Sequence, residues 1–254
     1  MKKIIHYCWF GKNEKSDLII KCIDSWKKYC PEYEIREWNE DNFDINCCAY
    51  VRQAYEEKKW AFVSDYCRYY VLNKYGGIYL DTDVELIKNL DDLPETFVGF
   101  ENEVTVASGL IRGANQGDEI CRLMLESYQK DIFLKPNGQL NLLTVCVRET
   151  TILQKLGLIA NGTLQIVGKT TVYPADYFCP LNNLTNKLTI TENTYSIHHY
   201  GASWYGEKEN YMKSLRLRLS KILPGIVADK IAFIISLVRY DGIKGLLKNI
   251  KARL

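Results

Sequence analysis

Three carboxylates occur at alternate positions in residues 76–85 of this 254-residue chain, GGIYLDTDVE. Successive side chains of an extended strand point to opposite faces, so Asp81, Asp83 and Glu85 are expected to share one face while apolar residues fill the other. Clustered carboxylate oxygens suit hard cations such as magnesium, manganese or calcium, because like charges this close are costly unless something neutralises them. The stretch predicts either a metal site or the solvated outer face of a half-buried strand.

The residues that follow these acids argue against one common calcium site. A calcium-binding helix-loop-helix loop that began at Asp81 would need glycine at its sixth position and glutamate at its twelfth. Those positions hold Leu86 and Asp92. The function of these carboxylates must therefore be inferred from other segments of the chain.

A second pair of charged residues precedes this stretch. Asp65 and Arg68 are three residues apart in a segment of helical character, so they lie on one face of the helix that leads into the carboxylates. The pair is either a surface ion pair, which stabilises little, or a carboxylate and a guanidinium presented together to a polyol. Spacing alone favours the surface ion pair.

Two of the three histidines, His198 and His199, are adjacent in a late segment that is expected to be a strand. Adjacent residues of a strand point to opposite faces, so at most one of them readily joins a single site. The alternative is one exposed histidine and one hydrogen-bonded core histidine. Ser203 and Trp204 follow, and their hydroxyl and indole N–H are donors that could hold phosphate oxygens.

Alternating strand and helix patterns must position these residues. An apolar strand over residues 3–10, a helix over 17–29 and a strand over 33–38 predict an α/β fold with a mainly parallel sheet flanked by helices. Ligands of such a sheet bind beyond the carboxyl ends of its strands. We therefore expect Trp9 and the two aspartates to share one crevice, although a large aromatic residue at a strand end is most often core packing.

The same patterns extend along the rest of the chain. They predict helices over about 49–59, 61–75, 116–131 and 142–156, and strands over about 76–86, 97–100, 108–112, 164–167 and 195–199. Internal repeats and low-complexity linkers are absent from the sequence.

The composition is that of an ordinary globular protein and argues against several classes. Nine cysteines, an odd number with no CxxC pair, speak against a disulfide framework and against a zinc site. The N-terminal residues lack the long apolar run and small-residue cleavage site of a secretory signal, so a reducing cytoplasmic compartment is expected. The sequence contains no run of the roughly 18 to 20 apolar residues that a membrane-spanning helix needs.

Charge is distributed unevenly along the chain. Residues 213–254 hold ten basic and two acidic residues, a net charge of +8, which leaves −6 for the preceding residues because the whole chain carries +2. The apolar run 231–238 is short and flanked by Lys230 and Arg239, which suits a basic amphipathic helix on an anionic membrane surface better than a membrane span. A helix packed on the domain with its lysines in solvent fits this pattern equally well. Nucleic acid is not an expected partner, since the acidic body lacks a binding motif.

Four segments of the chain stand out together, namely IIHYCWFG (4–11), SDYCRYYVLNKYGGIYLDTDVE (64–85), YPADYFCP (173–180) and IHHYGASW (197–204). With these segments the chain resembles glycosyltransferase family 32. This family includes bacterial capsule and lipopolysaccharide transferases with a DXD motif in a sugar-binding region and, more distantly, the glucosylating domain of large clostridial toxins. The resemblance ends near Trp204, so residues 1–205 are the expected catalytic domain and residues 206–254 a basic amphipathic tail.

The resemblance implies a GT-A fold, a nucleotide-diphosphate sugar donor, usually a uridine one, a divalent cation (Mn²⁺ or Mg²⁺), and retention of configuration at the anomeric carbon. Carried over residue by residue, it implies that Trp9 stacks on the uracil and that Tyr79 lines the donor pocket. It also implies that Asp65 and Arg68 hold hydroxyls of the donor sugar.

The same resemblance also implies which residues bind the metal and which cover the phosphates. Asp83 would bind the metal that bridges the diphosphate, with Asp81 beside it as a second carboxylate that contacts the ribose or the sugar. His198 or His199 would be the remaining metal ligand, and the match does not fix which. Ser203–Trp204 would close over the phosphates. A cation already coordinated by phosphate oxygens needs only one or two protein carboxylates, which a DXD motif at a strand end provides.

By this resemblance the chain is expected to transfer a hexose to an oligosaccharide on polyprenyl diphosphate, at the cytoplasmic face of the bacterial plasma membrane, in capsule or lipopolysaccharide synthesis. No carboxylate stands out as a covalent nucleophile, so the working hypothesis is a front-face displacement in which the leaving phosphate helps to deprotonate the acceptor. Two alternatives stay open. One is a metal-dependent hydrolase of nucleotide sugars or phosphoesters, and the other is a non-catalytic sugar-binding module.

Overall fold

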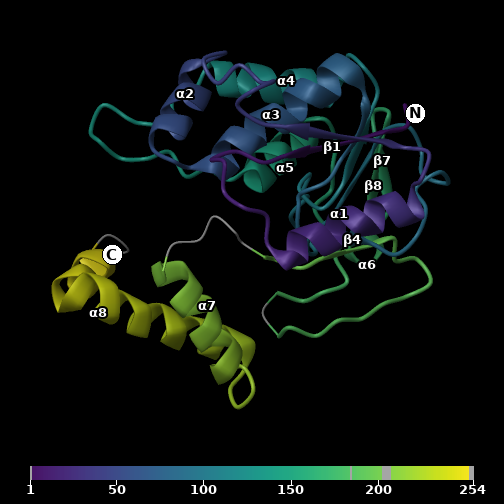
Figure 1. Ribbon diagram of the computed structural model, residues 1–254. Coiled ribbons are helices and arrows are strands. Elements are labelled where there is room, and N and C mark those ends of the chain that lie inside the picture. Colours follow the sequence, from purple (N-terminus) through teal and green to yellow (C-terminus); the bar gives the residue numbers. More distant parts are fainter. Residues whose placement is uncertain (1, 184, 202–206, 252–254) are drawn as a thin grey trace. The chain divides into compact units, whose positions relative to one another are not determined.

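The computed structural model describes residues 2–183, 185–201 and 207–251. The chain forms two compact units (Figure 1). They are the sheet unit, Met1–Pro180 with Thr189–Gly201, and the helical unit, Leu181–Leu188 with Ala202–Leu254.

A mixed sheet forms the centre of the sheet unit (Figure 1). Its strands lie in the order β2-β1-β3-β6-β5-β8-β7, with bounds β1 Ile4–Cys8, β2 Glu34–Trp38, β3 Gly77–Tyr79, β5 Phe97–Gly99, β6 Arg112–Ala114, β7 Gln165–Val167 and β8 Thr170–Tyr173. The pairs β1–β2, β1–β3 and β5–β8 are parallel, whereas β6 and β7 run antiparallel to their neighbours. Most of the strands therefore point in one direction, and the expected α/β fold with a mainly parallel sheet is confirmed.

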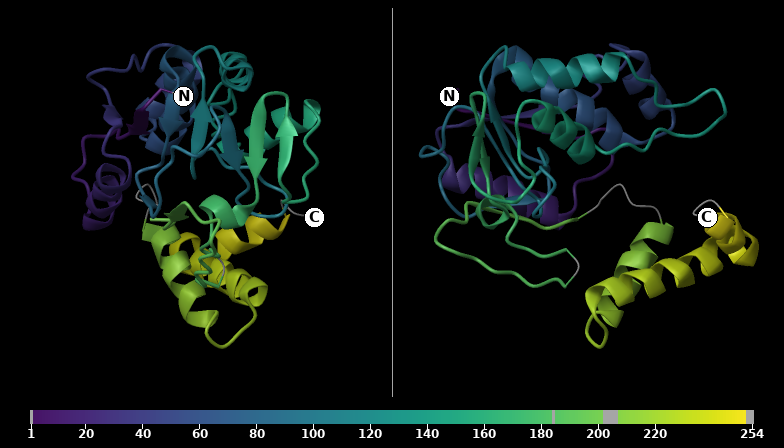
Figure 2. Two further views of the ribbon diagram at one scale, coloured as in Figure 1. Left: turned by 90° about the vertical axis from the view of Figure 1, so that its right-hand side faces the viewer. Right: turned by 180° about the vertical axis from the view of Figure 1, so that it is seen from behind.

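Helices cover both faces of this sheet. They are α1 Asp17–Tyr29, α2 Ala49–Glu56, α3 Trp60–Tyr75, α4 Glu119–Gln129, α5 Val145–Lys155 and α6 Ala175–Phe178. Helices α2 to α5 pack on one face, and α1 and α6 pack on the other (Figures 1 and 2). The expected helical flanks on the sheet are therefore confirmed.

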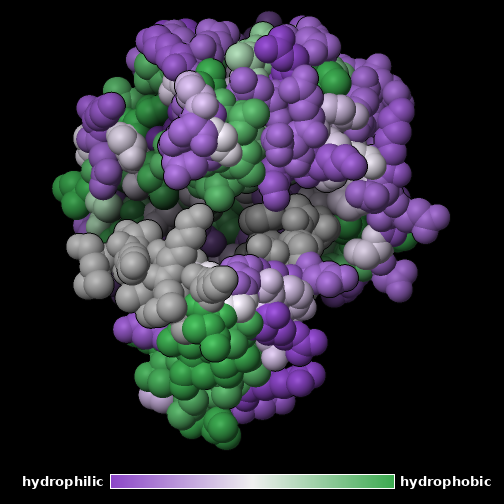
Figure 3. Space-filling model, turned by 90° about the vertical axis from the view of Figure 1, so that its left-hand side faces the viewer, coloured by the Kyte–Doolittle hydropathy of each residue, from purple (hydrophilic) through white to green (hydrophobic). Residues whose placement is uncertain are grey.

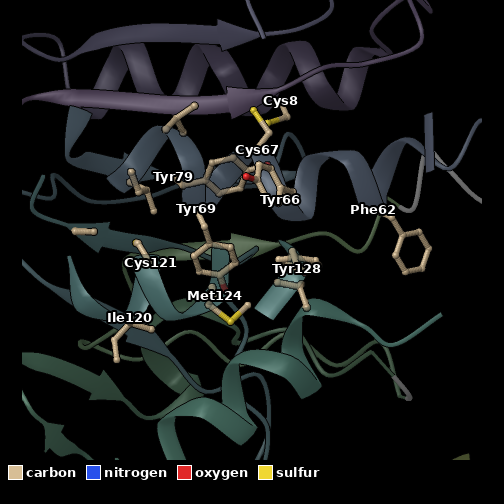
Figure 4. Close-up of a cluster of buried hydrophobic side chains, with 14 of the residues drawn as sticks. Cys8, Phe62, Tyr66, Cys67, Tyr69, Tyr79, Ile120, Cys121, Met124 and Tyr128 are labelled. Carbon is tan, nitrogen blue, oxygen red and sulfur yellow. The ribbon is translucent and has the colours of Figure 1, made fainter. Parts of the chain in front are cut away.

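Alternation along the strands divides the core into two clusters. Tyr79 and Val98 belong to the cluster under α2 to α5, whereas their chain neighbours Ile78 and Phe97 belong to the cluster that α1 covers. Figure 4 shows part of the first cluster, to which α3 contributes Tyr69 and β3 contributes Tyr79. Because α3 packs on β3 through this cluster, polar residues of both elements can reach one site.

The prediction of a single strand over residues 76–86 is wrong. β3 ends at Tyr79, and a turn closed by the hydrogen bond from Val84 N to Asp81 O (3.1 Å) follows it. A separate antiparallel pair then forms, between β4 Val84–Leu86 and β9 Ser196–His198. Packing overrides the local alternation, because Val84 is fully buried and its carbonyl accepts a hydrogen bond from Trp26 Nε1 at 2.7 Å. The turn, rather than a strand, sets the positions of the first two carboxylates.

Two further strands differ from the sequence pattern. The strand expected over 108–112 begins only at Arg112, which leaves residues 108–111 as a loop. Arg112 is fully buried in β6 because its guanidinium pairs with Glu149 at 2.7 Å and with Asp118 at 3.2 Å. β8 is not predicted by the sequence pattern at all. β6 begins with a charged residue and β8 is only four residues long, so neither strand produces a clear apolar alternation.

The helical unit contains α7 Glu207–Leu219 and α8 Gly225–Lys251, and α8 kinks at Gly242, where φ is 67°. Ala228 and Ala232 are fully buried in α8 and lie four residues apart, so this side of the helix is packed. Arg216 in α7 donates hydrogen bonds to the backbone and side-chain oxygens of Asn183 at 3.0 and 2.9 Å. Within the described residues, every helix is too short or too polar to cross a membrane.

Candidate active site

Three candidate metal ligands from two distant parts of the chain lie together. β4 pairs with β9 so that Val84 lies opposite His198, which brings this histidine to the turn before β4. Ligand atoms of Asp81, Asp83 and His198 lie within 4.8 Å of one another. His198 Nε2 is 3.2 Å from Asp83 Oδ1. Carboxylate oxygens suit Mg²⁺ and Mn²⁺, and imidazole is the commonest metal-binding side chain, so the donor set fits a divalent cation.

Asp83 and His198 stabilise each other's charged forms. Burial by itself would raise the pKa of the Asp83 carboxyl, but the neighbouring His198 and the N–H of Gly201, 2.7 Å from Oδ2, lower this pKa to about 2. Burial by itself would lower the pKa of His198, yet the Asp83 carboxylate outweighs it and raises the pKa to about 10. The proton on His198 thus supplies the positive charge that a bound cation would otherwise supply.

The second histidine of the pair, His199, contacts a different carboxylate. His199 Nε2 is 2.7 Å from Glu85 Oε2, and the same oxygen accepts a hydrogen bond from Lys21 Nζ at 2.7 Å. The backbone N–H of His199 donates to the carbonyl of Asp83 at 2.9 Å. The structure therefore brings His198, and not His199, to the aspartates, and it places Glu85 outside this cluster.

Asp65 and Arg68 are inside the protein, so the surface ion-pair interpretation is wrong. They are only 7% and 3% exposed. Arg68 Nη2 lies 3.2 Å from Asp65 Oδ1 and 3.0 Å from Asp81 Oδ1, and the guanidinium lies over the Tyr79 ring, 4.8 Å from its centroid. Arg68 therefore links the α3 carboxylate to the first carboxylate of the turn, with the buried Tyr79 ring beneath it.

The burial of Asp65 changes its acidity. Removal from water raises the pKa of the Asp65 carboxyl to about 7, although the positive charge of Arg68 acts in the opposite direction. A carboxyl with this pKa exchanges its proton near neutral pH. Buried titratable groups with such shifts are concentrated at functional sites.

The remaining predicted donor contacts are less closely tied to this cluster. Trp9 follows β1 and is partly buried, and its Nε1 donates a hydrogen bond to the carbonyl of Asn13 at 2.7 Å. Lys15 Nζ lies 5.7 Å from the centroid of the Trp9 ring. Ser203 and Trp204 lie outside the described residues. The roles of Trp9, Ser203 and Trp204 at the donor remain predictions.

Two contacts at the site were not foreseen from the sequence. Ser108 accepts a hydrogen bond from Arg68 Nη1 at 3.2 Å, and the backbone N–H of Gly201 binds Asp83. Tyr200, before this glycine, has a φ of 51°, which is uncommon for a residue with a side chain. A serine in an irregular loop and a backbone N–H carry no sequence signal of this kind, although Gly201 lies in the IHHYGASW segment.

Comparisons with known proteins support the part of the candidate site that lies within residues 16–98. Residues 16–98 match a family model described as a glycosyltransferase sugar-binding region containing a DXD motif. This range includes Asp65, Arg68, Asp81 and Asp83 but neither Trp9 nor His198. No curated protein matches the chain.

Two solved structures have partial similarity to the chain. One is the PaToxG glycosyltransferase, with 21% identity, coverage of 61% of this chain and 70% of that one, and a TM-score of 0.48. The other is a glycosyltransferase involved in glycosylation of the major capsid of PBCV-1, with 9% identity, coverage of 86% and 99%, and a TM-score of 0.39. The match over 16–98 and the Asp81-Thr82-Asp83 motif together identify a glycosyltransferase-like sugar-binding region with a DXD motif.

Proposed function

We propose that this protein is a metal-dependent, retaining glycosyltransferase that takes a hexose from a uridine-diphosphate sugar. The observation that carries the proposal is the cluster of Asp81, Asp83 and His198, whose ligand atoms lie within 4.8 Å of one another. The DXD family match over 16–98 supports a nucleotide-sugar donor. The buried Arg68 next to this cluster supports a site for a polar ligand.

Asp83 and His198 would hold the cation, with Asp81 as the second carboxylate. When bound, Mn²⁺ or Mg²⁺ supplies a Lewis acid that neutralises the charge of the departing diphosphate. Binding requires His198 to release its proton, because a metal ligand must be unprotonated. Gly201 N–H holds the second oxygen of Asp83, so the carboxylate is already oriented before a ligand arrives.

Asp65 and Arg68 would bind hydroxyls of the donor sugar. A guanidinium donates up to five hydrogen bonds and a carboxylate accepts them, so the pair can fix a polyol in one orientation. Tyr79 supports the guanidinium from below. Trp9 is proposed as the surface for the uracil, and Ser203 and Trp204 as the residues that close over the phosphates.

The proposed reaction is a front-face displacement. The bond between the anomeric carbon and the diphosphate oxygen breaks, and the oxygen of the acceptor hydroxyl bonds to the same face of that carbon. The hydroxyl proton passes to an oxygen of the leaving phosphate, so no protein nucleophile is needed. Arg68 keeps the sugar in place during this exchange, which reduces the entropy lost in the transition state.

The helical unit supports an acceptor at a membrane. Ile226, Ile234 and Val238 recur at four- and eight-residue spacing along α8 and are all exposed, as is Lys230 among them. Figure 3 shows apolar side chains gathered over part of this unit. An exposed apolar row with lysines fits the boundary of an anionic bilayer. We propose peripheral attachment at the cytoplasmic face of the plasma membrane and an oligosaccharide acceptor on polyprenyl diphosphate, in capsule or lipopolysaccharide synthesis.

Product analysis tests this proposal. The purified protein is incubated with Mn²⁺ and each of UDP-glucose, UDP-galactose and their N-acetyl derivatives, with and without membranes that contain polyprenyl-linked oligosaccharides. We expect one sugar to enter the lipid fraction with retained anomeric configuration. Release of free sugar regardless of acceptor would instead indicate a hydrolase, and sugar binding that needs neither nucleotide nor metal would indicate a binding module.

A further inference from the structure

The loop before β6 contacts two residues of the candidate active site from outside the family-matched range 16–98. Ser108 is fully buried, and its Oγ accepts hydrogen bonds from Arg68 Nη1 at 3.2 Å and from the Tyr69 hydroxyl at 2.7 Å. These two bonds use both acceptor positions of the serine oxygen. Two consecutive residues of α3 are therefore fixed to one hydroxyl of a distant loop.

The next residue of the loop, Gly109, contacts Asp81, the first acidic residue of the turn. The carbonyl of Gly109 accepts a hydrogen bond from the backbone N–H of Asp81 at 3.0 Å. A Cβ atom on Gly109 would lie 2.2 Å from Asp81 Oδ2 and 3.3 Å from Arg68 Nη1. The backbone of Gly109 is not in the left-handed region, so the lack of space, and not its conformation, requires a glycine here.

These contacts restrict the same guanidinium from two sides. Asp65 and Asp81 both approach Nη2 of Arg68, whereas Ser108 is bound to Nη1. Rotation of the guanidinium would break one of these contacts. A side chain that must bind a sugar in one orientation benefits from neighbours that lock its rotamer.

We propose that the Ser108–Gly109 segment positions Arg68 and Asp81 for the donor sugar. Ser108 acts on the sugar only through Arg68, with Tyr69 fixing the serine hydroxyl. Gly109 acts by leaving the space in which the Asp81 carboxylate lies. This inference rests on the proposed function and adds the residues that determine how accurately the donor is held.

A serine elsewhere in the protein offers a matched control for Ser108. Ser127 Oγ accepts a hydrogen bond from Nη1 of the buried Arg148 at 3.3 Å, and that arginine also pairs with Asp131 at 2.6 Å. Ser108→Ala and Ser127→Ala therefore each remove a hydroxyl from a buried arginine. We expect Ser108→Ala to lower kcat/KM for the UDP-sugar by about tenfold or more, at an unchanged KM for acceptor, because a positioned contact to a charged group is lost. For Ser127→Ala, kcat/KM for the UDP-sugar should stay within about twofold of the wild-type value, because this serine contacts Arg148 and not Arg68.

A double-mutant cycle tests the part of Tyr69. If Tyr69 acts through Ser108, the Tyr69→Phe change should have little further effect on kcat in the Ser108→Ala background. Fully multiplicative effects would contradict this route. Equal kcat/KM values for Ser108→Ala and Ser127→Ala, with both proteins folded by circular dichroism, would overturn the positioning role of the serine.

Gly109→Ala is compared with Gly117→Ala, since a methyl group at Gly117 meets no atom within 4 Å but carries the strain of a φ of 75°. We expect both variants to melt at a lower temperature and only Gly109→Ala to bind Mn²⁺ at least about tenfold more weakly, measured by electron paramagnetic resonance. Equal Mn²⁺ affinities would overturn the role of Gly109. Absence of wild-type turnover with every UDP-sugar would overturn the proposed function alone, because Mn²⁺ affinity still decides whether Gly109 positions Asp81.

Discussion

His198 Nε2 lies 3.2 Å from Asp83 Oδ1 across the β4–β9 strand pair. This contact joins the end of the DXD motif to a residue outside the family-matched range. It also distinguishes two adjacent histidines, since His199 binds Glu85 instead. The candidate cation site is therefore assembled by tertiary pairing and is complete only when β9 is in register.

Removal of His198 and removal of His199 are expected to have different effects on metal binding. His198→Ala deletes one ligand of the proposed site, so we expect Mn²⁺ affinity to fall at least about tenfold, measured by electron paramagnetic resonance titration. His199→Ala removes a contact to Glu85 on the outer side and should change Mn²⁺ affinity by less than about threefold. Equal losses in the two variants would contradict the assignment of His198 as the ligand.

Arg68→Lys tests whether the geometry of the guanidinium matters beyond its charge. Lysine keeps the positive charge but cannot bind Asp81 and Ser108 through two separate nitrogens in a fixed plane. We expect kcat/KM for the donor to fall roughly a hundredfold, about 2.7 kcal/mol of transition-state stabilisation. Arg148→Lys is the control, because it alters another buried arginine with a carboxylate partner. A similar loss of turnover in the control would show that general destabilisation is the cause.

Asp65 predicts a particular dependence of stability on pH. Its pKa is about 7 in the folded protein, above the ordinary value of 3.8, so the folded state holds this proton more tightly than the unfolded state. The contribution of Asp65 to the free energy of unfolding is therefore largest below pH 4 and is lost as the pH rises toward 7, with a slope of at most about 1.4 kcal/mol per pH unit.

Asp65→Asn removes this contribution. Urea unfolding between pH 4 and 7, without metal or nucleotide, should give a smaller decrease in stability across this range than in the wild type. Asp24→Asn, which changes an exposed carboxylate paired with Lys27, is the control and should follow the wild-type profile. Parallel profiles for the wild type and Asp65→Asn would be inconsistent with a raised pKa at this position.

The exposed row on α8 predicts membrane binding. Replacing Ile226 and Ile234 with serine removes two exposed apolar side chains, each worth about 1.5–3 kcal/mol when buried. We expect the double variant to bind vesicles of anionic phosphatidylglycerol at least about tenfold more weakly in a flotation assay. Ile166→Ser alters an isoleucine of β7 that is more exposed than either of these, and this variant should bind the vesicles as the wild type does. Unchanged binding by the α8 variant would contradict the membrane proposal.

The sequence predicts the elements more accurately than their pairing. Helix α1 begins and ends at Asp17 and Tyr29, as its apolar spacing and the following Pro31 indicate. The break between β3 and β4 depends on a hydrogen bond from Trp26 and on pairing with β9, which are far apart in the sequence. Local alternation continues through this break, so it predicts one strand where the protein has two.

Prediction of the candidate site from the sequence is limited in the same way, because local patterns do not show contacts between distant segments. The resemblance of the contiguous segment 64–85 to a known family selects Asp65, Arg68, Asp81 and Asp83, whereas spacing alone favours a surface ion pair for the first two. The choice between the histidines and the contact from Ser108 depends on contacts between distant segments, which spacing cannot supply. Burial also could not be inferred for Asp65, since a carboxylate and an arginine three residues apart are usually exposed.

The most direct test of the central claim is the melting temperature of the wild type and of Asp83→Ala with a panel of UDP-sugars, each with and without Mn²⁺. A ligand that binds only the folded state adds about 2.7 kcal/mol of stability at a hundredfold excess over its Kd. We predict that one UDP-sugar raises the wild-type melting temperature only when Mn²⁺ is present, and that the shift is lost in Asp83→Ala. Equal shifts in both proteins, or no shift with any nucleotide sugar, would contradict a metal-dependent donor site at the DXD motif.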